Sequence, residues 1–421
     1  MSQALFHPLT LPNGQELPNR IAKAAMEERM AASGQLPGEH LFTLYRAWSK
    51  GGSGFLLTGN VMVHDAALTG PGGVVLDKNS PIEPFRKWVE AAHSGGAKIW
   101  MQINHPGRQV QANMPGVAWG PSAGRVNTGR TSSMFAEAEE MTEAQIEQTI
   151  QRFVDTANRA EEAGFDGVEV HAAHGYLLSQ FLSPLVNKRT DKWGGSLENR
   201  ARMLMEVIHR IRAEVKPDFT VAVKLNSADF QRGGFDEQDA ARVIEMLAPL
   251  GVDLVELSGG SYESPAMTGN SQSNDSKDQS KQDEHTAARE AYFLELAEKL
   301  VDDSPIPLMV TGGVTRRETA EAVISSGVAV VGMGTALAVD PNLPEKWKVD
   351  ASARVTLAPV RIKDKAIASA VSMARVRYQM HRLGRGRSPL PKFPALLAFG
   401  WDFVRDEVNR RRYAKWLSER G

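Results

Sequence analysis

The fold is decided by residues 165–200, FDGVEVHAAHGYLLSQFLSPLVNKRTDKWGGSLENR. The stretch begins with a short apolar run, 166–170, which follows a helical pattern and predicts a buried parallel strand. This strand delivers His171, His174 and Tyr176 into the loop beyond its carboxyl end. Because ligands bind at that end in sheets built from βα units, the sequence places its candidate functional site here.

His171, His174 and Tyr176 put three hydrogen-bonding groups with different proton affinities on one short loop. Such a set can hold a carbonyl oxygen and supply a proton to the carbon beside it. The alternatives are a zinc site and histidines that simply lie on the surface. Because the chain has no cysteine, a third and a fourth zinc ligand would have to be remote His, Asp or Glu residues. We therefore favour a catalytic role and predict no metal.

The composition is that of an ordinary soluble protein of 421 residues, with a net charge of −1 and no cysteine. This charge gives no reason to expect nucleic acid as a partner. The missing cysteines exclude disulfides, thiol catalysis and cysteine-bound iron–sulfur clusters. The chain shows no secretory leader and no apolar run long enough to span a membrane, so we expect a cytoplasmic protein without membrane attachment.

Segments rich in Val, Ile and Leu recur along the chain, and each is followed by a helical pattern. This alternation predicts an α/β fold, because right-handed crossovers between parallel strands need covering helices. Both a (β/α)8 barrel and a doubly wound sheet fit the spacing. The expected strands are Ile21–Met26, Phe55–Val61, Lys98–Asn104, Gly167–Val170, Thr220–Asn226, Leu254–Ser258, Leu308–Thr311 and Val328–Gly332. A capping box at 142–145 opens a helix that runs to Ala163, and Ser196 is placed to cap a helix that runs to about Val215.

Three stretches do not fit this alternation. Residues 105–140 are rich in Gly, Pro and polar side chains and predict a subdomain over the site. Residues 259–285 are almost free of apolar side chains and predict a polar loop at the catalytic face, either a lid or a surface insert without a role. We expect the barrel to occupy 1–350 and an extension to occupy 351–421.

The extension is basic and aromatic. From Arg375 to Gly421 it holds 12 Lys and Arg residues against 4 Asp and Glu, interleaved with Phe, Trp and Tyr. Such a segment can cover its own barrel, pack on a neighbouring subunit or bind an anionic surface such as a membrane. We favour packing on the barrel or on a second subunit, and we expect a homo-oligomer.

The motifs HAAHGYLLSQFLSP and NKRTDKWGGSLENR resemble the sequence that marks the Old Yellow Enzyme family of FMN-dependent ene-reductases, in its HxxH form. The match is ungapped and extends, in the family's order, through roughly the first five-sixths of the chain. The resemblance implies a (β/α)8 TIM barrel with an inserted subdomain after the third strand and a C-terminal helical extension. The lack of cysteine does not fit the branch of the family that carries an iron–sulfur cluster.

FMN is the cofactor that the resemblance implies. Glycine-rich turns at 311–313 and 332–335 suit its phosphate, because their backbone N–H groups can bind an anion. Gln102 can pair with the pyrimidine edge, and Lys224 can place a positive charge near the flavin N1. The implied flavin-binding residues are Ala25, Met26, Glu27, Gly59, Gln102, Lys224, Gly312, Gly313, Gly332, Gly334 and Thr335.

Two of these positions depart from the family's pattern. Thr335 stands where the family often has an arginine, so the phosphate would rely on backbone groups or on another basic residue. Glu27 stands where the family commonly has a threonine or cysteine that tunes the flavin. We hypothesise that Glu27 alters the redox potential of the flavin.

The resemblance implies that NADH or NADPH reduces FMN, and that the reduced flavin then reduces an alkene conjugated to a carbonyl or nitro group. His171 and His174 would hold the electron-withdrawing oxygen, and Tyr176 would protonate the α-carbon. Other interpretations are a desaturase, demethylase-like or lyase-like enzyme of a catabolic pathway, a weakly catalytic flavin-binding interaction protein, and a flavin-free barrel such as an aldolase. The sequence does not identify the small-molecule substrate.

Overall fold

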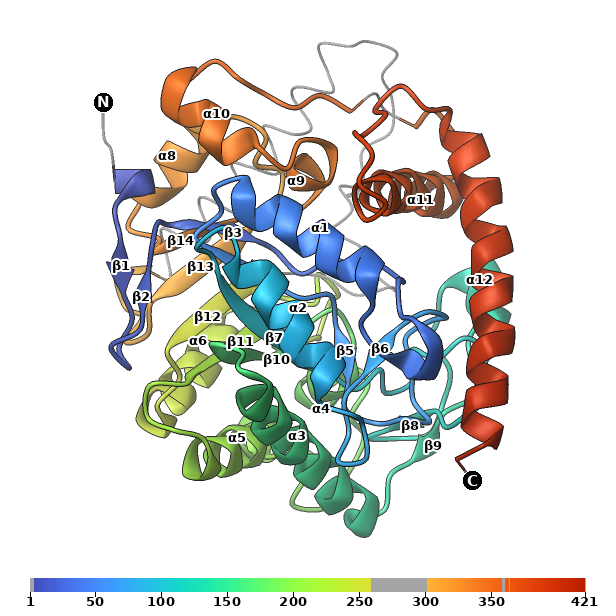
Figure 1. Ribbon diagram of the computed structural model, residues 1–421. Helices are drawn as coiled ribbons and strands as arrows, with labels where there is room; N and C mark the ends of the chain where they lie inside the picture. Colours follow the sequence, from blue (N-terminus) through green and yellow to red (C-terminus); the bar gives the residue numbers. More distant parts are fainter. Residues whose placement is uncertain (1–3, 259–300, 358–359, 363, 421) are drawn as a thin grey trace.

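A closed barrel of parallel strands forms the centre of the computed structural model, which describes residues 4–258, 301–357, 360–362 and 364–420 (Figure 1). Pairing of the last strand with the first, and of the third with the fourth, closes the ring. The predicted (β/α)8 TIM barrel is therefore confirmed. The barrel strands are β3 (Ile21–Lys23), β4 (Phe55–Leu57), β7 (Lys98–Asn104), β10 (Gly167–Ala172), β11 (Thr220–Asn226), β12 (Leu254–Ser258), β13 (Leu308–Thr311) and β14 (Val330–Met333).

Helices cover the outside of the barrel, and short elements decorate its ends (Figure 1). The α-helices are α1 (Glu39–Lys50), α2 (Glu83–His93), α3 (Glu143–Ala163), α4 (Leu177–Leu182), α5 (Leu197–Glu214), α6 (Glu237–Leu247), α8 (Arg317–Ser325), α9 (Thr335–Val339), α10 (Leu343–Val349), α11 (Lys365–Leu383) and α12 (Ala395–Ser418). The short elements are η1 (Ala4–Phe6), β1 (Leu9–Thr10), β2 (Glu16–Leu17), η2 (Ser33–Gln35), β5 (Val61–Met62), β6 (Val74–Val75), β8 (Trp119–Gly120), η3 (Gly129–Met134), β9 (Glu139–Glu140) and η4 (Ala248–Leu250).

Alternation along the strands separates the core from the site. On β10, Val168 and Val170 join the large apolar core beneath the helices, whereas Glu169 and His171 face the barrel interior. Near the amino ends of the strands the interior is apolar, with a base formed by Ala22, Phe55, Leu57, Trp100, Ala222, Leu254, Met309 and Val330. Further along, the inward positions become polar, so the strand order and register gather the polar groups at the carboxyl ends.

The helix starts follow the local sequence. Thr142 and Gln145 form the predicted capping box of α3, which ends at Gly164 in a left-handed conformation. Ser196 accepts a hydrogen bond from the N–H of Asn199 and so caps α5, as predicted. Both helices therefore begin where short-range patterns place them.

Two strands end earlier than the sequence predicts. The expected strands Ile21–Met26 and Phe55–Val61 stop at Lys23 and Leu57. The carboxylate of Glu28 accepts from the backbone N–H of Gly59 at 3.2 Å, so this N–H takes a side chain as its partner instead of a neighbouring strand. The chain beyond both strands thus folds around a side chain.

Residues 105–140 form a separate layer at the end of the barrel. Strands β8 and β9 pair within this insertion, and the ring of Trp119 stacks on those of His64 and His105 at centroid distances of 5.2 and 6.2 Å. The predicted inserted subdomain is therefore present. The polar loop predicted at 259–285 lies outside the described residues.

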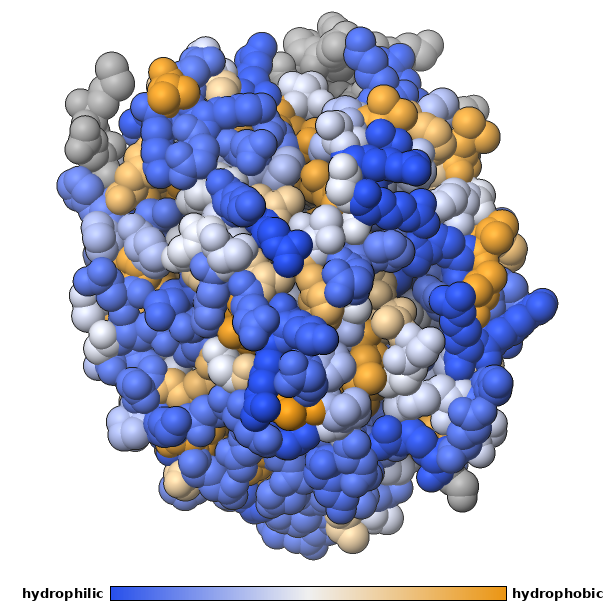
Figure 2. Space-filling view, in the orientation of Figure 1, coloured by the Kyte–Doolittle hydropathy of each residue, from blue (hydrophilic) through white to orange (hydrophobic). Residues whose placement is uncertain are grey.

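The extension folds into helices α11 and α12, which pack on the chain's own barrel (Figure 1). Tyr413 on α12 donates to the carbonyl of Asp65 at 2.9 Å. Apolar side chains remain exposed along the outer face of α12, including Leu397, Phe403 and Val404 (Figure 2). No helix within the described residues is long and apolar enough to cross a membrane.

Candidate active site

His171 and His174 lie at the carboxyl end of β10, and the backbone of His174 is strained. Its φ is 60°, which residues other than glycine rarely adopt. The N–H of His174 donates to Asn226 Oδ1 at 3.0 Å, and its carbonyl accepts from Gln109 Nε2 at 2.7 Å. Strain that is held from two sides is typical of a functional position.

The two histidine rings form a hydrogen-bonded chain that ends on Ser258. The N–H of Ala173 donates to His171 Nδ1 at 3.2 Å, so the Nε2 of a neutral His171 carries the hydrogen. This Nε2 lies 3.2 Å from His174 Nδ1, and His174 Nε2 lies 2.6 Å from Ser258 Oγ. Because a hydroxyl both donates and accepts, His174 can adopt either tautomer. An oxygen placed beside both nitrogens can then accept an N–H from each ring.

Both rings are held neutral. Burial lowers the pKa of His171 well below its ordinary value, and repulsion from a charged His174 and from Lys224 adds to this effect. Burial and Lys224 likewise depress the pKa of His174. Neutral imidazoles that donate N–H groups suit an oxygen on which negative charge grows during a reaction.

Tyr176 completes the set predicted from the sequence. Its ring lies 5.0 Å from that of His171, nearly perpendicular to it, and its hydroxyl donates to Glu27 Oε1 at 3.3 Å. The side chain is buried, with 5% of its surface exposed. The structure therefore brings His171, His174 and Tyr176 together at one end of the barrel.

Four inward-facing side chains form a buried layer nearer the amino ends of the strands. Gln102 Nε2 donates to Glu169 Oε2 at 2.6 Å, and Lys224 Nζ donates to Glu256 Oε1 at 2.7 Å. Burial and the repulsion of Glu256 raise the pKa of Glu169 well above its ordinary value. Burial acts most strongly and raises the pKa of Glu256, but Lys224 and the hydrogen bonds of Glu169 and Thr311 together outweigh burial and lower it. A protonated Glu169 therefore lies beside an ionised Glu256, and one positive charge balances the layer.

The glycine turns lie at the ends of β13 and β14. Gly312 and Gly313 have φ values of 153° and 66°, which favour glycine. Gly334 precedes α9, and no side chain caps that helix, so its first N–H groups suit an anion. A Cβ on Gly334 would lie 3.5 Å from Met26 Sδ, so the end of β14 closely approaches the segment after β3. This cradle fits the phosphate of FMN.

Gly59 and Ala25 have other contacts. The N–H of Gly59 donates to Glu28 Oε1 and to the hydroxyl of Tyr45, at 3.2 and 3.1 Å. A Cβ at Gly59 would lie 2.0 Å from Glu28 Oε2, so only glycine leaves room for this carboxylate. Ala25 packs against the apolar base of the barrel. The contacts of these two residues with flavin stay predictions.

Three polar residues at strand ends had no function assigned to them from the sequence. Asn226 and Ser258 fix His174, as described above. The side chain of Asn104 is fully buried, and neither atom of its amide has a hydrogen-bond partner within the described residues. Because Asn104 follows Gln102 by two positions, it faces the same side of β7. The sequence could have indicated all three, because each is a polar residue at an inward-facing position near the end of a strand.

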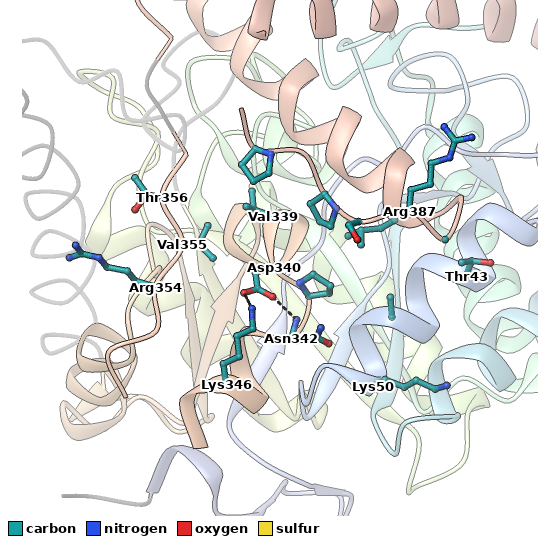
Figure 3. Close-up of a pocket in the computed structure, with 17 residues that line it drawn as sticks. Thr43, Lys50, Val339, Asp340, Asn342, Lys346, Arg354, Val355, Thr356 and Arg387 are labelled. Carbon is teal, nitrogen blue, oxygen red and sulfur yellow. Dashed lines mark hydrogen bonds and ion pairs between the residues drawn. The ribbon is translucent and has the colours of Figure 1, made fainter. Parts of the chain in front are cut away.

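A surface hollow of about 700 Å³ lies away from these residues, between α1, the turn after α9 and residues 386–391 (Figure 3). Asp340 at its edge pairs with Lys346 at 2.5 Å. No predicted site residue lines the hollow, so we give it no part in the reaction. Among the described residues, no group of three His, Asp or Glu side chains is placed to hold a metal ion.

A closed (β/α)8 barrel with neutral donors and phosphate-binding turns at its carboxyl end is typical of flavin-dependent oxidoreductases. The family model described as NADH:flavin oxidoreductase / NADH oxidase matches residues 4–353. The NADH-dependent flavin oxidoreductase iliE of Hypocrea jecorina (strain QM6a) is 35% identical over 359 residues, which cover 80% of this chain and 87% of the relative. The chain belongs to this NADH:flavin oxidoreductase family, which includes the Old Yellow Enzyme type.

Solved structures agree with the fold. A 2-naphthoyl-CoA reductase in complex with 2-naphthoyl-CoA is 28% identical, with a TM-score of 0.72, and the match covers 83% of this chain and 52% of that reductase. An Old Yellow Enzyme homologue from Zymomonas mobilis is 24% identical, with a TM-score of 0.66, and the match covers 84% of this chain and 95% of the homologue. The expected cofactor FMN and a nicotinamide reductant are confirmed at the level of the family.

Proposed function

We propose that the protein reduces the activated C=C bond of an α,β-unsaturated carbonyl or nitro compound. The observation that carries this proposal is the pair of neutral imidazoles, His171 and His174, beside the hydroxyl of Tyr176. The relative iliE is named an NADH-dependent flavin oxidoreductase, which supports NADH as the source of electrons here. In the balanced reaction, one NADH and one proton convert one C=C bond to a C–C bond and yield NAD⁺.

His171 and His174 hold the electron-withdrawing oxygen of the substrate. His171 Nε2 and His174 Nδ1 are 3.2 Å apart, so an oxygen beside this pair can lie within hydrogen-bond reach of both and accept an N–H from each ring. Ser258 permits this, because its hydroxyl can donate to His174 Nε2 while Nδ1 carries the hydrogen. Donors fixed before the reaction stabilise the charge that develops on this oxygen.

Tyr176 supplies the proton to the α-carbon. Its ring lies next to that of His171, so its hydroxyl would lie close to the carbon adjacent to a carbonyl held by the histidines. Asn104, on the neighbouring strand β7, offers a buried amide to the substrate or the cofactor.

When bound, FMN would supply the chemistry of electron transfer between NADH and the β-carbon of the substrate. Gly312, Gly313 and Gly334 would hold its phosphate through backbone N–H groups. Gln102 and Lys224 would lie at the pyrimidine edge of the ring system. Thr335 is the first residue of α9, where its N–H can contribute in place of a cationic side chain.

Anaerobic titration of the FMN-loaded protein tests the function. NADH and NADPH are added in separate experiments, followed by 2-cyclohexenone, and the visible flavin band is recorded. We expect bleaching by NADH and recovery on addition of the enone. Bleaching without recovery would reject reduction of enones and favour desaturation. A protein that takes up no flavin would reject the proposal altogether.

We further propose a division into a barrel at 1–350 and an extension at 351–421, a homo-oligomeric state and a cytoplasmic location. The packing of α11 and α12 on the barrel supports treating the extension as a structural unit. Sedimentation velocity of the full chain tests the oligomeric state, and a monomer at all concentrations would reject it.

A further inference from the structure

A chain of polar contacts links Tyr176 to the C-terminal extension. The hydroxyl of Tyr176 donates to Glu27 Oε1 at 3.3 Å, and Asn60 Nδ2 donates to the same oxygen at 3.3 Å. Arg29 Nη2 lies 3.5 Å from Glu27 Oε2. Arg29 Nη1 in turn donates to Asp406 Oδ2 on α12 at 2.5 Å. The catalytic hydroxyl is therefore connected, through one carboxylate and one guanidinium, to a helix outside the barrel.

The extension also fixes the backbone of residues 27–29. His381 Nε2 on α11 donates to the carbonyl of Glu28 at 2.9 Å. Arg405 on α12 donates to the carbonyl of Arg29 at 3.3 Å. Arg29 has a φ of 52°, a left-handed conformation that a neighbouring structure must hold in place. Both extension helices therefore determine where Glu27 lies.

Glu27 is held ionised. Burial by itself raises the pKa of this carboxyl, but the charges of Arg29 and Arg377 and the hydrogen bonds of Thr69 and Asn60 outweigh burial and lower it. The carboxyl groups of Asp402 and Asp406 on α12 also face this cluster. The pKa of Asp406 is raised, because burial, Asp402 and Glu27 outweigh the charges of Arg29 and Arg377. Glu27 therefore accepts the hydrogen bond of Tyr176 as a carboxylate.

A small cavity lies next to Glu27. Its volume is about 20 Å³, and its lining includes Glu27, Arg29, Asn60 and Thr69. A cavity needs roughly 10–15 Å³ and two or more polar partners to hold one water molecule. The cavity can therefore hold one water molecule in contact with Glu27.

We propose that Glu27 is the relay through which Tyr176 regains its proton after each turnover, and that Arg29 and Asp406 hold the relay in place. This inference rests on the proposed role of Tyr176 as proton donor. When the O–H bond of Tyr176 breaks, a C–H bond forms at the α-carbon and the phenol oxygen keeps the electron pair. A proton from water passes through the carboxylate of Glu27 to this oxygen. Tyr176 and Glu27 then return to their starting states, with one proton taken from solvent.

Glu27→Gln separates proton donation from reloading. In the first turnover Tyr176 already carries its proton, so oxidation of the NADH-reduced protein by 2-cyclohexenone should slow far less than proton uptake does. Proton uptake, followed by stopped flow with a pH-indicator dye, should slow by about 100-fold or more, and so should all later turnovers. Glu27→Asp should restore part of the uptake rate, and Tyr176→Phe should slow the first turnover itself.

Other results would show which proposal fails, the relay through Glu27 or the role of Tyr176 as proton donor. Proton uptake at the native rate in Glu27→Gln would overturn the relay. A first turnover slowed as much as in Tyr176→Phe would also overturn it, because Glu27 would then act in donation. A native first turnover in Tyr176→Phe would instead overturn the proton donor of the proposed function.

A second pair of variants tests the contribution of α12. Asp406→Asn removes the charge that holds Arg29 and should slow proton uptake by about two- to fivefold. Glu407→Gln is the matched control, because this neighbouring carboxylate pairs with Arg410 and Arg411 on the same helix. Equal rates in both variants would remove the extension from the relay.

Discussion

The interior of the barrel and the loop at 27–29 both bury charge, but they balance it differently. In the interior, Glu256 is neutralised by Lys224 on the adjacent strand, at a distance set by strand register. In the loop, Glu27 is balanced by Arg29, and Arg29 is held by Asp406 from α12. The first arrangement is built into the sheet, whereas the second depends on a distant segment of the chain.

This difference separates charges that stabilise the fold from charges that influence the chemistry of the site. Side chains on paired strands cannot move apart without breaking the barrel, so their charges are part of the folded core. The charges around residues 27–29 are less deeply buried and lie on segments that are far apart in the sequence. We therefore expect changes in the interior to affect folding, and changes in the loop to affect the chemistry of the site.

The largest effect is expected from Lys224→Met. It leaves the buried carboxylate of Glu256 without its partner, so the free energy of unfolding should fall by about 3–5 kcal/mol. Lys346→Met is the control, because its pair with Asp340 is half exposed and should contribute less than about 1 kcal/mol. Urea denaturation of both variants measures the difference. Equal losses would show that Lys224 does not balance the interior.

An intermediate effect is expected from His64 at the rim. Burial, and then Arg152, lower its pKa from 6.5 to about 4. The unfolded chain therefore binds a proton that the folded protein does not, and stability is complete above pH 6.5 and falls as the pH approaches 4, by up to about 3 kcal/mol. His64→Phe keeps a ring against Trp119 and should reduce this slope by about one proton. The exposed His209→Phe is the control, and equal slopes in urea titrations at several pH values would contradict the assignment.

The smallest effect is expected on the redox potential of the flavin. An ionised Glu27 opposes the negative charge of reduced flavin, so Glu27→Thr should make the potential more positive. Arg29 offsets much of this charge, which keeps the shift small. Anaerobic potentiometric titration measures it, with Glu139→Thr in the exposed strand β9 as control. An unchanged potential would reject the hypothesis that Glu27 tunes the flavin.

The sequence predicts the strands well because they are continuous apolar runs with polar residues at their ends. The spacing also fits a doubly wound sheet, and only the resemblance to the family selects the barrel. The sequence also predicts the place of His171, His174 and Tyr176, since all three follow one strand. It does not predict that Glu27 meets Tyr176, 149 residues away, or that Arg29 meets Asp406, 377 residues away. No local pattern encodes such contacts, because they arise when separate elements pack. The sequence also does not predict the early ends of β3 and β4. Beyond β4, the N–H of Gly59 bonds to the side chain of Glu28 instead of to the backbone of a neighbouring strand.

The match to the family model ends at residue 353, yet the loop at 27–29 is bound by the side chains of His381, Arg405 and Asp406. A carboxylate at position 27 and the two terminal helices should therefore be inherited, and transplanted, as one module. A chimera that moves Glu27 into a related barrel without these helices would place an uncompensated charge beside the catalytic tyrosine. A chimera that moves both would carry the whole arrangement with it.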